Sequence, residues 1–255
     1  MKTFTILGTG WLGYELALSL KDSYNVKVSI RENSQKDKLI NEGLDPYLLN
    51  ESAFQNIDTL LETDYLFINF PPSKFENYLI FLDKIYNNKK IKQIKKIIFI
   101  SSTSIYPNEN NSFDESFFIE EPISKKVFES EELIKDKTDV IFRCSGLMGY
   151  NRIAGKYFAG KSLDSEDVKV NYVHRDDVIS ATLFIIKKDI NGIFNLCSSF
   201  HPTRKEVYLK NAKELNFIEP KFENKKEYKN RIIDGRKIES LGFRYKYPNP
   251  LEYKY

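Results

Sequence analysis

Three glycines near the start of the chain, Gly8, Gly10 and Gly13, constrain its fold more than any other feature. They follow a short apolar segment, residues 3–7, and precede a stripe in which leucine recurs every four residues (Leu12, Leu16 and Leu20). A G-x-G-x-x-G pattern between a strand and a helix is typical of a dinucleotide-binding turn. We expect Gly8 to permit the turn, Gly10 to let the backbone approach a pyrophosphate, and Gly13 to let the helix pack closely on the strand. A structural turn without a ligand is the alternative.

Strand-like and helix-like segments alternate along the rest of the chain, which is typical of a parallel sheet covered by helices. Strands are expected over residues 26–30, 65–70, 96–100, 140–143, 168–172 and 193–197, and helices over 78–86, 122–135, 176–187 and 203–215. The predicted fold class is therefore α/β, a Rossmann-type doubly wound parallel sheet with a small mixed α/β C-terminal portion. We expect a dinucleotide-binding domain over residues 1–150 and a smaller substrate-side portion, interwoven with it, over residues 151–255.

Composition narrows the class of protein. The 255 residues include 39 Lys and Arg against 36 Asp and Glu, without a dense basic block, so charge does not suggest a nucleic-acid partner. No apolar run approaches the roughly 18 residues of a membrane-spanning helix, and the start of the chain lacks a signal-peptide cleavage site. The two cysteines, Cys144 and Cys197, have neither disulfide nor zinc-site spacing. We expect a cytoplasmic protein with a small-molecule substrate and with no metal, nucleic acid or membrane as partner.

The residues after the second expected strand discriminate between NAD and NADP. An acidic residue there bonds the ribose 2′-hydroxyl group, whereas an arginine accommodates a 2′-phosphate. Arg31 stands about 20 residues after the glycine turn, where the acid is often found. The sequence therefore favours NADP. Glu32, one position later, keeps NAD open, and Arg31 as a solvated charge is the remaining alternative.

Several later stretches occur in an order known from one superfamily. They are FISSTSIYP at 99–107, RCSGLMGYNR at 143–152, NYVHRDDV at 171–178, GIFNLCSS at 192–199 and IIDGRKIESLGFRYKYP at 232–248. Together with GTGWLG they resemble the short-chain dehydrogenase/reductase superfamily, in its extended and atypical branch related to nucleotide-sugar epimerases. The resemblance covers nearly the whole chain. Members of that branch commonly dimerise through helices that flank the sheet, and the sequence leaves a homodimer open.

The usual chemistry of that branch uses a Ser, together with a Tyr and a Lys spaced four residues apart on the following helix. Ser102 falls on the catalytic Ser position, but the Tyr and Lys positions fall on Lys126 and Ser130. Lys126 is therefore a candidate cationic substitute that would polarise a substrate carbonyl. The two Tyr-x-x-x-Lys matches elsewhere, which start at Tyr86 and Tyr157, lie in the wrong places and are interpreted as coincidences.

The resemblance also implies the remaining site residues. Those expected to contact the cofactor, besides the three glycines and Arg31, are Trp11, Leu12, Phe70, Pro71 and Ser101. Those expected beside the substrate are Thr103, Tyr106 and Arg152, of which Arg152 has the charge to bind an anionic group. His174 is interpreted as structural, and Cys144 as a core residue with no base to activate it.

These observations favour an NADP-binding oxidoreductase or epimerase-like enzyme acting on a small carbonyl or hydroxyl substrate. The absence of the usual Tyr favours a different class, a non-catalytic NADP(H)-binding sensor or scaffold protein. An isomerase or dehydratase with a tightly held cofactor is a third alternative. A nucleotide-sugar substrate is not inferred, because the chain is shorter than most nucleotide-sugar epimerases.

Overall fold

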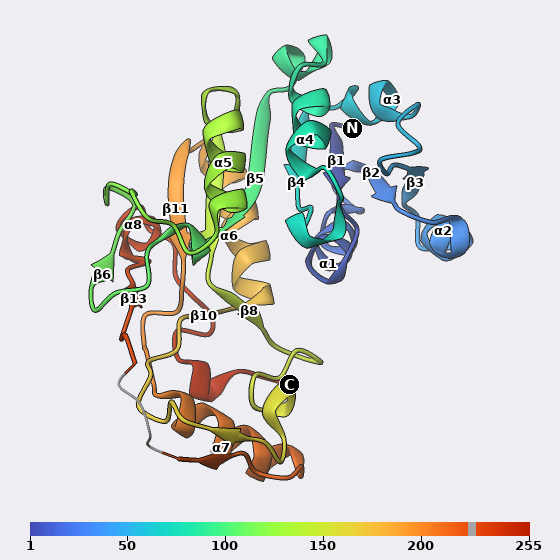
Figure 1. Cartoon of the computed structure of the whole chain (residues 1–255). Coiled ribbons are helices and arrows are strands. Elements are labelled where there is room, and N and C mark those ends of the chain that lie inside the picture. The colour runs from blue at the N-terminus through green and yellow to red at the C-terminus, as the bar shows by residue number, and fades with distance from the viewer. Residues whose placement is uncertain (224–227) are drawn as a thin grey trace. The chain divides into compact units, whose positions relative to one another are not determined.

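The computed structural model describes residues 1–223 and 228–255. Its central sheet has seven strands in the order β11-β7-β5-β4-β1-β2-β3 (Figure 1). Their bounds are β1 Thr3–Leu7, β2 Asn25–Ile30, β3 Asp45–Leu48, β4 Tyr65–Ile68, β5 Lys96–Ser102, β7 Val140–Cys144 and β11 Gly192–Leu196. The pairs β1–β2, β1–β4, β2–β3 and β4–β5 are parallel. This is the strand order of a doubly wound Rossmann fold, so the predicted fold class is confirmed.

Eight α-helices lie in the described part of the chain. They are α1 Trp11–Leu20, α2 Lys36–Asn41, α3 Ile57–Leu61, α4 Tyr78–Tyr86, α5 Lys125–Ile134, α6 Arg175–Lys188, α7 Arg204–Leu215 and α8 Arg236–Ser240. The helix expected from residue 122 begins three residues later, because the Ser124 hydroxyl accepts the Val127 N–H at 3.4 Å and so caps α5.

The prediction of a strand over residues 168–172 is wrong. The strand in this region is β10, Tyr172–His174, which pairs in parallel with β8, Gly146–Met148. Residues 168–171 lack such a ladder, although Lys169 forms an isolated antiparallel bridge with Thr203. The strand that has a pairing partner therefore starts four residues later than expected.

The chain divides into two compact units, each built from three segments. The first comprises residues 1–101, 124–142 and 185–193, and the second comprises residues 102–123, 143–184 and 194–255. The predicted dinucleotide-binding domain over residues 1–150 and substrate-side portion over residues 151–255 stay predictions, because these units carry no information on what each part binds.

In the first unit, one face of the sheet packs against α3, α4 and α5. The buried residues of this core include Leu66 and Ile68 of β4, Ile97 and Phe99 of β5, and Phe81 of α4. They lie at alternate positions of their strands because successive side chains of a strand point to opposite faces. Helices α4 and α5 run side by side on this core (Figure 1).

The second unit contains short parallel strand pairs besides β8 and β10. Strand β6, Ser112–Phe113, pairs with β13, Ile232–Ile233, and β9, Ser162–Leu163, pairs with β12, Lys221–Phe222. A small core forms around Ala154, Val170, Val207 and Tyr208. The second unit therefore mixes short strands with helices such as α7 and α8.

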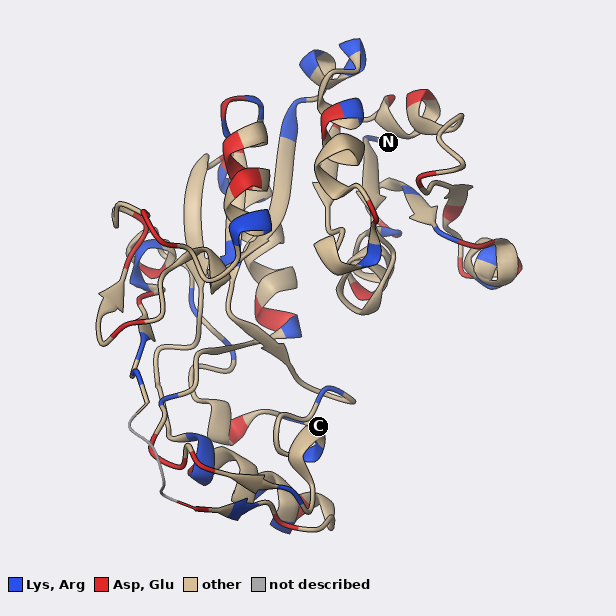
Figure 2. Ribbon diagram, viewed as in Figure 1, with Lys and Arg blue, Asp and Glu red and all other residues tan. Residues whose placement is uncertain are grey.

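Charged residues of both signs are interspersed along the elements of each unit, as α5 illustrates (Figure 2). Among the helices of the described residues, none has the length and apolar character needed to cross a membrane.

Candidate functional site

The glycine turn joins β1 to α1 with the geometry that its pattern predicts. Gly8 has a φ of +102°, and a Cβ there would lie 2.5 Å from the Asn69 carbonyl oxygen. A Cβ on Gly13 would lie 2.3 Å from the Gly8 carbonyl oxygen and 3.1 Å from Ile6 Cγ2. Both positions therefore exclude larger residues, the first by backbone conformation and the second by close packing of the helix.

Gly10 differs from the other two glycines. It is the N-cap of α1, and a Cβ there would meet no atom within 4 Å in the described structure. Among the described residues, no side chain caps this helix end and no acidic residue stands in its first turn. The helix N-terminus therefore presents backbone N–H groups and the positive end of its dipole, which is suited to binding phosphate.

The predicted neighbours of Gly10 in the turn are Trp11 and Leu12. Trp11 is half-buried at the first helical position, and Leu12 is 3% exposed. Leu12 is therefore a core residue, and what it can offer a ligand is its backbone.

Ser29 near the end of β2 holds this turn in place. Its hydroxyl oxygen accepts the Gly8 N–H at 2.8 Å, and its carbonyl oxygen accepts the Thr9 hydroxyl at 2.7 Å. Sequence reasoning missed this residue. Polar and apolar residues alternate along β2, so the only signal at Ser29 was a small hydroxyl residue two positions before Arg31.

Arg31 directly follows β2 and is exposed. Its guanidinium carbon lies 5.5 Å from the centroid of the Phe75 ring, while Asn50 Nδ2 donates to its carbonyl oxygen at 3.0 Å. No carboxylate forms an ion pair with its side chain among the described residues. Glu32 is also exposed and caps nothing with its side chain. Both candidate cofactor-specificity residues are thus accessible, and Arg31 is the one held against an aromatic ring.

Phe70 and Pro71 follow β4 at the carboxyl end of the strand. The Phe70 ring is 4% exposed and packs edge-on against Phe75 and Phe81, with ring centroids 5.3 and 5.4 Å apart. The Tyr78 hydroxyl donates to its carbonyl oxygen. The side chain of Phe70 is therefore part of the core, whereas Pro71 is exposed and begins a loop that leads to the 3₁₀-turn Pro72–Lys74.

A buried pair that sequence reasoning missed lies at the end of β5. The Ser101 hydroxyl donates to Oε1 of Glu131 on α5, and these residues are 8% and 3% exposed. Ser101 was predicted to contact the cofactor, and the structure shows its hydroxyl proton committed to a carboxylate. Val127, Glu131 and Ile134 share one face of α5 by spacing, so an acid at an apolar position was the signal.

Ser102 is the last residue of β5 and the first of the second unit. Its hydroxyl oxygen accepts the Ser104 N–H at 3.1 Å and so caps the 3₁₀-turn Thr103–Ile105. In the part of the chain that the structure describes, the Ser102 hydroxyl proton has no acceptor. Ser102 can therefore donate to a ligand without breaking the cap. Thr103 beside it is 4% exposed.

Tyr106 is completely buried and belongs to a polar network in the second unit. Its hydroxyl lies 2.8 Å from Asn195 Oδ1 and 2.9 Å from the Asp114 carbonyl oxygen, and it accepts from Arg143 Nη1 at 3.0 Å. Burial raises the pKa of this phenol, so it stays protonated. Its place beside a substrate stays a prediction.

Lys126 stands in the first turn of α5, at the position of the missing Tyr. Its side chain is exposed and makes no hydrogen bond or ion pair within the described residues. The Ser130 hydroxyl, which stands where the family has its Lys, donates to the Lys126 carbonyl oxygen at 2.6 Å. Ser130 is therefore structural, while Lys126 is accessible, and its role toward a ligand stays a prediction.

Arg152 and His174 lie in the second unit. Arg152 is half-buried, and burial lowers its pKa; its backbone bridges that of Gly149. His174 is 0% exposed, with its Nδ1 accepting the Asp176 N–H at 3.2 Å and its ring 4.0 Å from that of Tyr247. These contacts agree with a structural role for His174.

The remaining candidates are buried or engaged elsewhere. Cys144 is 4% exposed, and burial raises the pKa of its thiol well above the usual range. The Tyr86 hydroxyl accepts from Thr138, and Lys161 donates to the carbonyl oxygen of exposed Tyr157. Across residues 1–223 and 228–255, no cluster of three His, Cys, Asp or Glu side chains could hold a metal ion.

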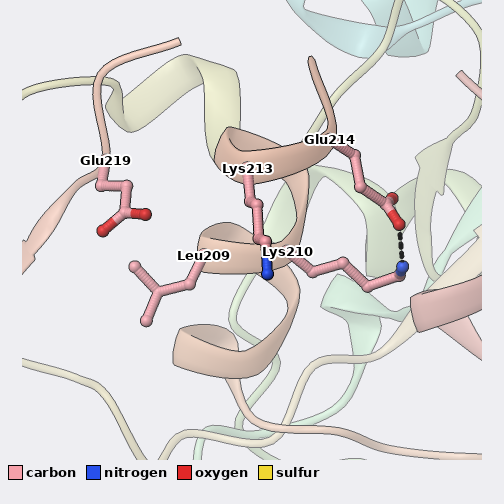
Figure 3. Close-up of a pocket in the computed structure, with 5 residues that line it drawn as sticks. All are labelled: Leu209, Lys210, Lys213, Glu214 and Glu219. Atoms are coloured by element: carbon pink, nitrogen blue, oxygen red, sulfur yellow. Dashed lines mark hydrogen bonds and ion pairs between the residues drawn. The ribbon is translucent and has the colours of Figure 1, made fainter. Parts of the chain in front are cut away.

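A surface hollow of about 500 Å³ lies over α7, and none of the residues discussed above lines it (Figure 3). Its lining consists of Leu209, Lys210, Lys213, Glu214 and Glu219, and Lys210 pairs with Glu214. Because the lining is a shallow set of surface side chains with charges of both signs, we assign it no function.

Several known proteins are similar to this chain over nearly its whole length. No family model matches the chain. Protein YeeZ of Escherichia coli strain K12 is 33% identical over 270 aligned positions, which cover 98% of each chain. A solved protein of Methylobacillus flagellatus, assigned as an NAD-dependent epimerase/dehydratase, has a TM-score of 0.81 at 18% identity and covers 97% of this chain and 94% of its own. The UDP-glucuronic acid 4-epimerase of Bacillus cereus, in complex with NAD, has a TM-score of 0.79 at 16% identity and covers 99% and 95%.

Proposed function

The chain belongs to the family of protein YeeZ and has the fold of the epimerase/dehydratase-like short-chain dehydrogenases/reductases, and from this premise we propose that it is an NADP-dependent enzyme of the atypical branch. It acts as an oxidoreductase or epimerase-like enzyme on a small substrate that carries a carbonyl or hydroxyl group. The observation that carries the proposal is the glycine turn, in which Gly10 faces open space while Gly8 and Gly13 are closely packed.

Several observations support a nicotinamide dinucleotide as the cofactor. The open turn and the uncapped N-terminus of α1 suit a pyrophosphate. The Bacillus cereus epimerase with the same fold is in complex with NAD. For this chain we favour NADP, because Arg31 is exposed, lies against Phe75 and forms no ion pair among the described residues, although its charge acts on Glu51. Arg31 would bind the 2′-phosphate with its planar guanidinium group.

Two residues of the chain are assigned roles in the reaction, Ser102 and Lys126. When bound, a nicotinamide cofactor would donate or accept the hydride. Ser102 donates its hydroxyl proton in a hydrogen bond to a substrate oxygen, while the Ser104 N–H keeps the Ser102 oxygen in position. Lys126 offers a positive charge at the first turn of α5, where the family's Tyr is absent.

The alternative function is a non-catalytic NADP(H)-binding sensor or scaffold. The specific observation that favours it is α5, in which neither Lys126 nor Ser130 reproduces the Tyr and Lys of the usual mechanism. The variant Ser102→Ala separates the two functions. If its activity falls at least about tenfold while its cofactor affinity is unchanged, the protein is an enzyme that uses Ser102.

Parallel titrations of the protein with NADPH and NADH test the cofactor. Trp11, the chain's single tryptophan, stands at the first position of α1, so quenching of its emission reports binding. We expect tight NADPH binding that weakens by roughly 1.5–3 kcal/mol in Arg31→Ala, with NADH much less affected. Preferential NADH binding, lost in Glu32→Ala and not in Arg31→Ala, would refute the NADP assignment.

A further inference from the structure

Arg231 approaches the end of a central strand from a distant part of the sequence. It stands directly before β13, and its Nη1 donates to the carbonyl oxygens of Thr103 at 3.3 Å and Tyr106 at 3.4 Å. These carbonyls belong to the turn that begins immediately after Ser102 at the carboxyl end of β5. Ligands of parallel α/β sheets bind outside the carboxyl ends of the strands.

The backbone around Arg231 is fixed. Asn171 Nδ2 donates to the Arg231 carbonyl oxygen at 2.8 Å, and Asn171 Oδ1 accepts the Ile233 N–H at 2.8 Å. The Ile232 N–H donates to the Asn111 carbonyl oxygen at 3.0 Å. The backbone that carries the Arg231 side chain is therefore fixed, and such a fixed backbone favours precise recognition of a ligand.

The charge of Arg231 lacks a counterion. The side chain is half-buried, and burial lowers the pKa of its guanidinium group, which nevertheless stays charged at neutral pH. Among the residues that the structure describes, no carboxylate pairs with it. Arg236, five residues later, is the contrast: it is exposed and bonded to both carboxylate oxygens of Asp234.

Most of the hydrogen-bonding capacity of Arg231 is also unused. Its two hydrogen bonds are long and come from Nη1 alone, so Nε and Nη2 donate to no group within residues 1–223 and 228–255. A guanidinium group presents paired donors in a rigid fork that matches the two oxygens of a carboxylate or phosphate. A half-buried cation of this kind is costly unless an anion joins it.

We propose that Arg231 binds an oxyanion of the substrate, a phosphate or a carboxylate group, next to the Ser102–Thr103 turn. This inference rests on the proposed function, since it names the chemical class of the substrate of that same enzyme. Because Arg231 also contacts the Thr103 carbonyl, binding of the anion would hold the turn that carries the Ser102 hydroxyl.

Calorimetric titrations with pyrophosphate and with malonate, at constant ionic strength and saturating NADPH, test the site. The wild-type chain should bind one of the two, pyrophosphate if the group is a phosphate and malonate if it is a carboxylate. Arg231→Gln should weaken that binding at least about tenfold. The matched control Arg236→Gln removes the same charge from an exposed position and should leave it unchanged.

Absence of binding of both probes to the wild-type chain would overturn the inference, as would equal affinity in Arg231→Gln or an equal loss in Arg236→Gln. If Arg231→Gln does not fold by circular dichroism, Arg231→Lys decides, because it keeps the charge and removes the fork. Its affinity should fall, and an unchanged affinity contradicts the assignment. NADPH affinity is measured separately for each chain, so a failure of the proposed cofactor is seen independently of the anion site.

Discussion

At the scale of single residues, the glycine turn shows how much chemistry a pattern can specify. Gly8, Gly10 and Gly13 were assigned three different roles from their spacing, and the structure gives them a positive φ, an open face and a close helix contact respectively. Ser29 and Glu131 were not foreseen, because their contacts join segments 21 and 30 residues apart. Local spacing carries no information on such partners.

Gly13→Ala should destabilise the fold. The added Cβ would lie 2.3 Å from the Gly8 carbonyl oxygen, which belongs to the backbone and cannot rotate away. We expect the free energy of unfolding in urea to fall by about 1–3 kcal/mol, as in other overpacked sites. Gly10→Ala is the control, since its Cβ meets nothing within 4 Å. Equal stability of the two variants would show that α1 does not pack on β1 as described.

At the scale of elements, the errors have physical causes. Strand β3 was not predicted because Pro46 lies in it, and proline is normally excluded from a ladder. The structure places β3 at the edge of the sheet, where one side of the strand needs no partner. Helices α2 and α3, of six and five residues, are too short to show a clear period. Helices α4, α6 and α7 were located to within a residue at each end.

The junction between β10, α6 and the C-terminal segment predicts a pH dependence. His174 is fully buried, and burial lowers its pKa from the ordinary value of about 6.5. It faces Asp176, Arg175 and Lys246, together with the rings of Tyr247 and Tyr253. The unfolded chain therefore takes up a proton at His174 more readily than the folded chain, so stability is lost as the pH falls below about 6.5.

Neighbouring Asp177 acts in the opposite direction. Burial raises its pKa to about 6, although its carboxylate accepts the N–H groups of Lys246 and Tyr247. The folded chain thus binds this proton more readily, and stability from Asp177 is gained as the pH falls through about 6. A comparison of wild type with His174→Gln cancels this contribution, because both chains contain Asp177.

Urea unfolding between pH 7.5 and pH 5 measures the effect of His174. The free energy of unfolding of the wild type should fall more steeply than that of His174→Gln, by at most about 1.4 kcal/mol per pH unit. Parallel profiles would mean that His174 titrates alike in the folded and unfolded chains.

At the scale of the whole molecule, the alternation of strands and helices sufficed to predict the Rossmann-type sheet, and the later motifs pointed to the superfamily whose fold the chain has. The order of the strands in the sheet depends on contacts between distant segments, so no local sequence pattern predicts it. The two units each draw on three segments of the chain, so a single boundary along the sequence does not describe them. The contact between Arg231 and Thr103 was least predictable, because it joins residues 128 positions apart.

The central claim is that the turn at Gly10 receives a dinucleotide phosphate. NADPH and NADH titration of wild type and Gly10→Val, followed by Trp11 emission and paired with thermal unfolding of each chain, tests it most directly. We predict that Gly10→Val keeps nearly the unfolding temperature of the wild type, because no atom lies within 4 Å of the new Cβ, and loses nucleotide binding, because the side chain fills the space of the phosphate. Unchanged nucleotide affinity in a folded Gly10→Val chain, or no binding of either nucleotide to the wild type, would contradict the claim.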